Sequence, residues 1–285
     1  MQIAIQVNLT RPNAADVTRE VIRQLHALGA VVLMEREMEP AFSALPVQFL
    51  QAEDAWAQCD LFIAIGGDGT FIHAAHDAAR YDKEILGINA GTLGFLAGLE
   101  KTELPLLRCL IDGNYEIDTR MMLCVEHTDA AGQTEKYYCL NDAVFARGLS
   151  MRMCDIAVDC DGKRVNDYFA DGLIFATPTG STAYSLSAGG PVVDPTIETV
   201  LLTPICTHSL FARSLLFRPE KTFRVEIRNP ELCQPLLSCD GEESLHIASD
   251  SVFEIRRAHR RCKIIRIKAE SFTDTLSRKM VERRV

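Results

Sequence analysis

A short glycine-rich segment carries the clearest chemical signal in this sequence. The apolar run Leu61–Ile65 leads directly into Gly66-Gly67-Asp68-Gly69-Thr70. Glycines allow the backbone to adopt positive φ and to approach a ligand closely, and the N–H groups at the start of a helix favour phosphate oxygens. Asp68 would then lie beside bound phosphate, where its carboxylate could accept a proton from an attacking hydroxyl or help to place a metal ion. The segment predicts a phosphate-binding loop with Asp68 as its reactive group.

The same loop has a plainer interpretation. It lacks the Gly-Lys-Ser/Thr of a Walker A loop and the G-x-G-x-x-G of the dinucleotide fold. A tight strand-to-helix turn with Asp68 as the helix N-cap would contain the same residue types, because Asp and Gly are both common in turns. The extra glycine and the fully apolar strand favour the phosphate-binding interpretation.

A second segment, from Asp171 to Pro191, combines a strand, a turn and many small polar residues. Leu173–Ala176 is predicted to be a strand and Thr177–Gly180 a turn, after which Ser181 or Thr182 would cap a helix. This would gather at one concave site the backbone of Thr182 and Ala183, the ring of Tyr184 and the hydroxyls of Ser185 and Ser187. The alternative is a loop of small residues with Tyr184 in the core.

These segments need elements to position them, and the first hundred or so residues alternate between strand and helix patterns. The predicted strands are Gln2–Val7, Val31–Met34, Asp60–Ile65 and Ile85–Ile88, and the predicted helices are Ala15–Leu28 and Thr70–Arg80. Such alternation predicts a parallel sheet covered by helices.

After about Arg120 the pattern becomes mainly β. Alternating or β-branched runs are Met121–Glu126, Lys136–Phe145, Cys154–Asp159, Leu173–Ala176, Thr222–Ile227 and Val252–Arg257, and a helix is expected near Ser181–Gly189. We therefore expect an α/β domain over residues 1–118 and a mainly β domain over residues 119–265. Residues 266–285 would form a C-terminal tail that could return to the first domain.

Composition narrows the class of protein. The 285 residues include 47% hydrophobic and 24% charged residues, which is typical of a globular chain. The formal net charge of -9 argues against a nucleic-acid or anionic-membrane partner, because such partners need a basic surface. No signal peptide and no apolar run of about 18 residues is evident, and ten scattered Cys without a C-x-x-C pair fit reduced thiols. A cytoplasmic enzyme is expected.

At this point the sequence resembles a known family. A Gly-Gly-Asp-Gly-Thr/Ser loop after a strand is shared by NAD kinases, diacylglycerol and sphingolipid kinases and 6-phosphofructokinases, which all transfer phosphate from a nucleotide to a hydroxyl. The run Asp171–Pro191 resembles the longest signature of bacterial NAD kinases. Further similar segments are Gly87–Leu96, Leu140–Asp142, Pro204–Leu210 and Ser238–Gly241, although Thr207 and Ser214 stand where the family has Pro.

The resemblance implies a kinase that transfers the terminal phosphoryl group of ATP to the 2′-hydroxyl of the adenosine ribose of NAD, giving NADP and ADP. Asp68 would be the catalytic base, Asn141 would hydrogen-bond adenine, and Asp142 would contact ribose hydroxyls. The full set of implied substrate-binding residues is Gly66, Gly67, Gly69, Thr70, His73, Asn141, Asp142, Arg152, Asp171, Thr182, Ala183, Tyr184, Ser185, Leu186, Ser187 and Glu242.

The same resemblance suggests partners and leaves alternatives. NAD and ATP, or another phosphoryl donor, would be the substrates, Mg²⁺ would arrive with the nucleotide at no dedicated protein site, and the chain would form a homodimer or homotetramer. His73 and His76 have a spacing that could bind metal, but ordinary helix histidines fit as well, and Arg152 could be merely solvated. A lipid kinase of the diacylglycerol kinase group and a catalytically silent dinucleotide-binding module are the alternative functions.

Overall fold

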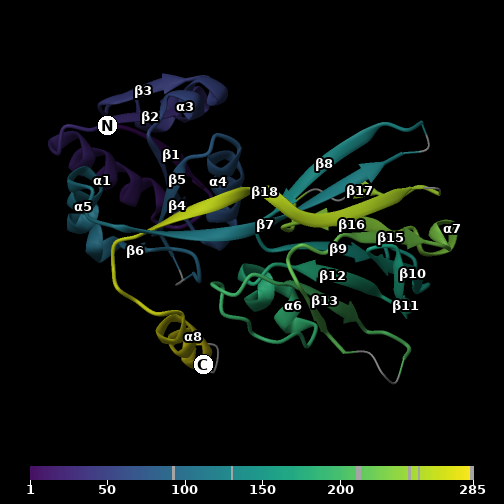
Figure 1. The fold of residues 1–285 in the computed structure, drawn as a ribbon. Coiled ribbons are helices and arrows are strands. Elements are labelled where there is room, and N and C mark those ends of the chain that lie inside the picture. Colours follow the sequence, from purple (N-terminus) through teal and green to yellow (C-terminus); the bar gives the residue numbers. More distant parts are fainter. Residues whose placement is uncertain (92–93, 130, 210–212, 243–244, 250, 283–285) are drawn as a thin grey trace. The chain divides into compact units, whose positions relative to one another are not determined.

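The protein is described by a computed structural model over residues 1–91, 94–129, 131–209, 213–242, 245–249 and 251–282. The chain divides into two compact units (Figure 1). Unit 1 comprises residues 1–119 and 261–285, and unit 2 comprises residues 120–260.

Unit 1 is built on a parallel sheet. Its strands follow the order β3-β2-β1-β4-β5, beyond which the end of β18 pairs in parallel with β5. The strands are β1 (Gln2–Val7), β2 (Val31–Glu35), β3 (Val47–Leu50), β4 (Leu61–Gly66), β5 (Glu84–Asn89), β6 (Leu99–Glu100) and β18 (Val252–Arg266). All six residues of the central strand β4 are buried, as expected for a strand covered on both faces. The predicted parallel sheet is confirmed, and β3 is a strand that the sequence did not reveal.

Helices cover both faces of this sheet (Figure 1). The helices of unit 1 are α1 (Ala14–Ala27), α2 (Glu39–Phe42), α3 (Ala52–Gln58), α4 (Asp68–Arg80) and α5 (Arg108–Asp112), with 3₁₀ turns η1 (Arg36–Met38) and η2 (Lys101–Leu107). The C-terminal helix α8 (Phe272–Glu282) follows β18 and lies apart from the sheet in Figure 1. Val21 and Leu25 of α1 pack in one apolar cluster with Ile63 of β4. The next side chain along β4, Phe62, points to the opposite face, where its ring lies 5.1 Å from that of Trp56 in α3.

Unit 2 contains two antiparallel sheets. One has the order β11-β10-β15-β18, with β7 pairing with β18 and β8, and the other has the order β14-β13-β12-β9-β16-β17. The bounds are β7 (Glu116–Thr128), β8 (Thr134–Cys139), β9 (Asp142–Ala146), β10 (Cys154–Cys160), β11 (Lys163–Ala170), β12 (Gly172–Ala176), β13 (Val200–Ile205), β14 (Leu215–Phe217), β15 (Phe223–Ile227), β16 (Leu236–Cys239) and β17 (Leu245–His246). Short helical turns are η3 (Thr179–Thr182), α6 (Tyr184–Ser187) and α7 (Pro230–Cys233). The predicted mainly β character of this half is confirmed.

An aromatic core joins the two sheets of unit 2. Phe145 of β9 lies 6.1 Å from Phe175 of β12 and 5.2 Å from Phe253 of β18, and Phe175 lies 5.3 Å from Phe223 of β15, measured between ring centroids. Tilted and edge-on contacts of this kind stabilise beyond the area that they bury. The core thereby fixes β9 and β12, the two strands that carry the second predicted site.

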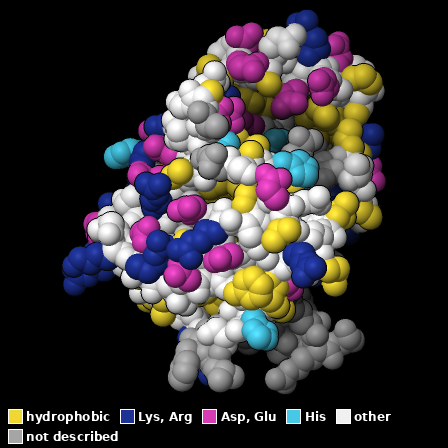
Figure 2. Space-filling model, turned by 90° about the vertical axis from the view of Figure 1, so that its right-hand side faces the viewer, with side chains coloured by type: hydrophobic (Ala, Val, Ile, Leu, Met, Phe, Trp, Pro, Cys, Tyr) yellow, Lys and Arg dark blue, Asp and Glu magenta, His cyan; other side chains and the backbone are white. Residues whose placement is uncertain are grey.

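The surface and the thiols agree with the composition. Acidic and basic side chains alternate over the face of the molecule shown in Figure 2. The ten cysteines, which all lie among the described residues, are thiols and form no disulfide. Among the described residues, no helix is long and apolar enough to cross a membrane.

We predict that Phe145→Ala lowers the free energy of unfolding by about 3–5 kcal/mol, because it leaves a cavity between the two sheets of unit 2. Denaturant titration measures the loss. Phe169→Ala is the control, since the Phe169 side chain is 51% exposed, and it should cost less than about 1 kcal/mol. Equal losses in both variants would contradict the packing described for Phe145.

Candidate active site

The phosphate-loop candidate lies where the sheet of unit 1 changes direction. From β1 the chain continues to β2 and β3 on one side, whereas β4 and β5 extend the sheet on the other side. Ligands of open α/β sheets bind beyond the carboxyl ends of the strands at such a point. β4 ends at Gly66, and α4 begins at Asp68 with Gly67 as its N-cap in extended conformation. The alternative in which Asp68 is the N-cap is therefore wrong.

The positive φ expected for the glycines of this loop is wrong, whereas their close approach to a ligand stays a prediction. Gly66, Gly67 and Gly69 are not among the residues with positive φ. A Cβ on Gly66 would lie 2.4 Å from the Thr70 Oγ1 atom, whereas positions 67 and 69 face open space. Thus Gly66 is small because Thr70 packs over it, and Gly67 and Gly69 leave their backbone uncovered. That geometry lets an anion approach the N–H groups at the start of α4.

The Asp68 carboxylate is held by a second loop. The Phe95 backbone N–H donates to Oδ2 at 2.9 Å, and the Leu96 N–H donates to Oδ1 at 3.1 Å. Gly94 is pressed against the same carboxylate, because a Cβ there would lie 2.1 Å from Oδ1. A carboxylate has about four lone-pair sites, so each oxygen of Asp68 can still accept a further hydrogen bond. The structure thus gives the segment Gly87–Leu96 a direct role beside Asp68, although Thr92 and Leu93 lie outside the described residues.

Asn89 anchors the start of this second loop. Its buried side chain donates from Nδ2 to both carboxylate oxygens of Glu100, at 3.1 and 3.0 Å, and its Oδ1 accepts the Gly91 N–H at 3.0 Å. The Ala90 N–H also donates to the Gly66 carbonyl at 3.2 Å. Sequence reasoning missed Asn89, whose signal was its place at the end of an apolar strand.

His73 lies on the exposed side of α4, one turn beyond the loop. His73 lies near Glu35. Burial, followed by the nearby carboxylates of Glu37 and Asp77, raises the pKa of Glu35, and His73 offsets part of this rise. Within the described part of the chain, no three His, Cys, Asp or Glu side chains are grouped so that they could hold a metal ion.

In unit 2 a second carboxylate, that of Asp240, accepts hydrogen bonds from consecutive backbone N–H groups. The N–H groups of Leu140, Asn141 and Asp142 donate to the Asp240 carboxylate at 2.6, 2.8 and 2.9 Å. Asp240 lies in the left-handed region at φ 53°, followed by Gly241 at φ 78°. These bonds replace ladder bonds, which explains why the predicted single strand Lys136–Phe145 is broken into β8 and β9.

Asp142 is almost completely buried at the start of β9, with 5% of its surface exposed. Burial, followed by the charge of Asp240, raises the pKa of its carboxyl to about 7, although a hydrogen bond from the Tyr184 N–H lowers it. That bond ties the start of β9 to the start of α6. Asp142 therefore carries only a partial negative charge near neutral pH.

The turn before α6 is hydrogen-bonded to the same segment, at Leu140 and Asn141. The Thr177 N–H donates to the Asn141 carbonyl at 2.8 Å, and the Thr177 hydroxyl donates to the Leu140 carbonyl at 2.5 Å. A Cβ on Gly180 would lie 2.1 Å from the Asn141 carbonyl oxygen, so only glycine fits there. The structure thus brings the Asn141–Asp142 pair together with the later part of the segment, from Thr177 to Tyr184. Asp171 lies at the opposite end of β12, where Gly172 pairs with Ala146 of β9.

The side chains of α6 divide into two groups. Tyr184 is 46% exposed, so the alternative with Tyr184 in the core is wrong, and Ser187 is exposed as well. Ser185 is fully buried and its hydroxyl lies 3.0 Å from the Thr203 hydroxyl. The expectation that this hydroxyl is presented at the site is therefore wrong, because Ser185 points inward against β13. Thr182 is also buried, and its hydroxyl donates to the Thr179 carbonyl at 3.3 Å, while Ala183 and Leu186 are half-buried.

Three further candidates lie at the ends of the same sheet. Asp171 accepts a hydrogen bond from Nε of Arg147 at 2.7 Å, and Arg147 was missed by sequence reasoning. The Arg152 side chain is exposed, and its N–H donates to the Ser150 hydroxyl at 3.1 Å. Glu242 is exposed, and its N–H donates to the Cys239 carbonyl at 3.0 Å.

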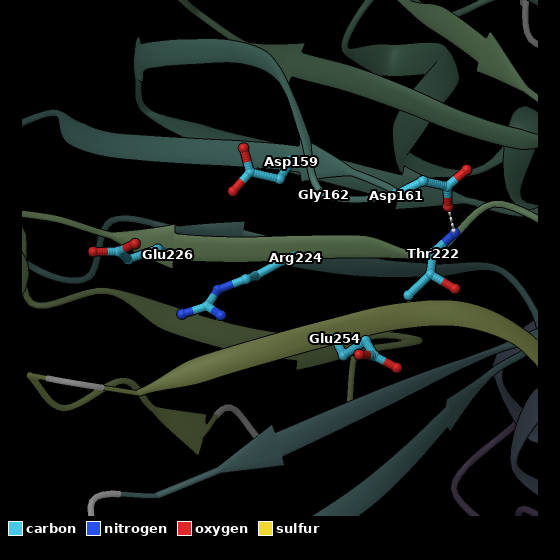
Figure 3. A pocket seen from close by; sticks show the side chains of 7 residues that line it. All are labelled: Asp159, Asp161, Gly162, Thr222, Arg224, Glu226 and Glu254. Atoms are coloured by element: carbon cyan, nitrogen blue, oxygen red, sulfur yellow. Dashed lines mark hydrogen bonds between the residues drawn. The ribbon is translucent and has the colours of Figure 1, made fainter.

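Two surface depressions in unit 2 contain none of these residues. One, of about 460 Å³, is lined by Asp159, Asp161, Gly162, Thr222, Arg224, Glu226 and Glu254 (Figure 3). The other, of about 430 Å³, lies between α7 and β17. The first presents four carboxylates and one guanidinium, a poor electrostatic match for an anionic dinucleotide.

Comparisons with known proteins decide the family. Residues 3–114 match the ATP-NAD kinase N-terminal domain, and residues 140–267 match the ATP-NAD kinase C-terminal domain. The chain is 35% identical over 285 residues to an NAD kinase of Caldanaerobacter subterraneus subsp. tengcongensis, covering 99% of each chain. The chain belongs to the NAD kinase family. An NAD kinase of Moorella thermoacetica is 37% identical over 284 residues, covering 99% of this chain and 89% of the relative.

Solved structures show the same fold. A yeast NADH kinase complexed with NADH has a TM-score of 0.86 at 24% identity, covering 97% of this chain and 85% of the other. An NAD kinase from Archaeoglobus fulgidus in complex with ATP has a TM-score of 0.72 at 23% identity, covering 98% of each chain. Membership of the NAD kinase family confirms the predicted enzyme class, a phosphotransferase with an alcohol acceptor, and removes the lipid-kinase alternative.

We predict that Asp142 makes the folded state less stable as the pH rises. The folded carboxyl keeps its proton up to about pH 7, whereas the unfolded one ionises near pH 4, so the folded state binds the extra proton in this interval and loses stability with increasing pH. Between pH 5 and pH 8 the free energy of unfolding should fall by about 2–3 kcal/mol more in the wild type than in Asp142→Asn.

Denaturant titrations of both proteins at the two pH values measure this difference. Asp167→Asn, which removes a half-exposed carboxylate of the same unit, should keep the wild-type pH dependence. An unchanged slope in Asp142→Asn would show that the Asp142 carboxyl is ionised throughout.

Proposed function

We propose that this member of the NAD kinase family transfers the terminal phosphoryl group of ATP to the 2′-hydroxyl of the adenosine ribose of NAD, giving NADP and ADP. The observation that carries the proposal is the fixed Asp68 carboxylate beside the open backbone of Gly67 and Gly69. A base and a phosphate cradle on adjoining residues are the parts that a kinase of this type needs.

The reaction needs little from Asp68 beyond position. The ribose oxygen attacks the γ-phosphorus, the bond from that phosphorus to the β,γ-bridging oxygen breaks, and the hydroxyl proton passes to Asp68. The transition state of phosphoryl transfer is loose, so the proton leaves late and a weak base is sufficient. The amides of Phe95 and Leu96 fix the carboxylate, and this fixed orientation is the main contribution of the protein to the step.

The donor would be bound at the start of α4. The uncovered N–H groups of Gly67 and Gly69 face the phosphates, with Gly66, Thr70 and His73 completing the surface. Mg²⁺, carried by the triphosphate, would offset the charge of the transferred group.

NAD would be recognised by the segments of unit 2. The Asn141 side chain would hydrogen-bond adenine and Asp142 would contact the ribose hydroxyls, with Tyr184 offering an exposed ring for stacking. The remaining members on this side of the sheet are Thr182, Ala183, Leu186, Ser187 and Glu242, with Ser185 acting through its backbone. Asp171 and Arg152 lie toward the opposite end of β12, so they would bind a different part of a substrate. We also expect a cytoplasmic homodimer or homotetramer.

We predict that Asp68→Asn keeps NAD affinity within about threefold but lowers kcat by about 10²–10⁴-fold, because the amide cannot accept the proton. Calorimetric titration of NAD and a coupled assay of NADP formation measure the two effects. Asp82→Asn, at the far end of α4 and paired with Lys263, should leave both unchanged. Near-normal turnover of Asp68→Asn would rule out Asp68 as the base, whereas an inactive wild type would favour the catalytically silent alternative.

We predict that Gly94→Ala lowers kcat by about ten- to a hundredfold, because the new Cβ would displace the Asp68 carboxylate and small misplacements of reacting groups are costly. The same coupled assay measures the loss. Gly91→Ala is the matched control, since a Cβ at that position meets no atom within 4 Å. A Gly94→Ala enzyme as active as the control would show that the close approach of Gly94 to Asp68 has no catalytic importance.

A further inference from the structure

The C-terminal helix of unit 1 reaches the loop that holds Asp68. Lys279 of α8 places its ammonium nitrogen 5.3 Å from the centroid of the Phe95 ring. The backbone N–H of this same Phe95 donates to Asp68 Oδ2. A side chain 184 positions further along the sequence thus contacts Phe95, which orients the predicted base.

The two halves of this loop are anchored unequally, so the less anchored half gains most from a further contact. Leu96 is buried, and beyond it the Gly98 N–H donates to the Gly87 carbonyl at 2.9 Å. Phe95 is only half-buried. A cation within about 6 Å of a ring is attracted to its face, so Lys279 restrains the less anchored residue of the pair that binds Asp68.

The helix that carries Lys279 is itself tethered to unit 1. Ser271 and Asp274 cap its start reciprocally: the Ser271 N–H donates to the Asp274 carboxylate and the Asp274 N–H donates to the Ser271 hydroxyl, both at 3.1 Å. Just before the helix, Lys268 donates to the Glu103 carboxylate at 2.8 and 3.0 Å. These contacts give Lys279 a defined position.

We propose that Lys279 is a positioning residue for the phosphoryl-transfer step. It holds the Phe95 ring, and through the Phe95 and Leu96 amides it keeps the Asp68 carboxylate oriented toward the acceptor hydroxyl. The role rests on the proposed function of Asp68. Lys279, and with it the C-terminal helix α8, would thereby contribute to turnover without contacting a substrate.

A double-mutant cycle tests this chain of contacts. Lys279→Met removes the charge but keeps the length of the side chain, and Phe95→Leu removes the ring but keeps the backbone. A cation–π contact at an exposed site is worth about 0.5–1 kcal/mol, which corresponds to a factor of about two to five. Each single variant should lower kcat by about two- to fivefold with unchanged KM for NAD and ATP, and the double variant should lose no more than the single variants do.

Two further variants separate positioning from general effects of charge. Lys279→Arg preserves a cation over the ring and should restore wild-type kcat. Arg278→Met removes a neighbouring charge that pairs with Glu270 at 2.9 Å and should leave kcat unchanged. A raised KM for ATP in Lys279→Met, or a loss as large in Arg278→Met, would overturn the proposal in favour of direct or long-range attraction of the phosphates.

A readout that does not depend on activity completes the test. Amide hydrogen exchange of Phe95 and Leu96 should become about two- to fivefold faster in Lys279→Met and in Phe95→Leu, but not in Lys279→Arg or Arg278→Met. Unchanged exchange in Lys279→Met would overturn the proposal even if the kinetics change. If the wild type forms no NADP, the proposed function fails on that result, whereas the exchange rates still decide whether Lys279 holds the loop.

Discussion

The candidate site of unit 1 depends on one carboxylate that accepts two backbone amides. Asp68 begins α4, but its oxygens bind the N–H groups of Phe95 and Leu96 in the loop after β5. A carboxylate at this position is also favoured by the helix dipole. The two hydrogen bonds therefore link two strand-to-loop transitions that follow neighbouring strands, and the small size of Gly94 is the steric condition for that link.

Unit 2 contains a similar interaction, in which a carboxylate again accepts hydrogen bonds from backbone N–H groups. Asp240 accepts three consecutive amides and thereby interrupts the strand pattern at Leu140–Asn141. The freed Asn141 carbonyl then accepts the Thr177 N–H, and Gly180 packs on the Asn141 backbone. Charge-assisted hydrogen bonds are about twice as strong as neutral ones, which explains how a single side chain can override the local preference for a continuous strand.

These contacts mark the limit of what the sequence could reveal. The two motif segments were found from their residue types and from family resemblance. Apolar periodicity was sufficient for the parallel sheet and the β-rich second half, because periodicity reports which face of an element is buried. It could not reveal the partners of Asp68 and Asp240, since those residues lie 27 and about 100 positions away along the chain. Residue types alone led to the wrong expectation of positive φ for the glycines of the first loop and of an exposed Ser185 hydroxyl. The same residue types can serve positive φ, close packing, ligand contact or an internal hydrogen bond.

The acidity of the chain and the charge of its proposed substrates can be reconciled by these local arrangements. A net charge of -9 gives no general attraction for phosphates, so attraction must come from oriented dipoles at short range. The uncovered N–H groups at the start of α4 supply such dipoles. The Asp68 charge is shared with two amides, and the raised pKa of Asp142 keeps a fraction of that carboxyl neutral near pH 7. In the proposed reaction, each of these carboxylates would therefore repel the phosphates of a substrate less than a freely solvated charge would.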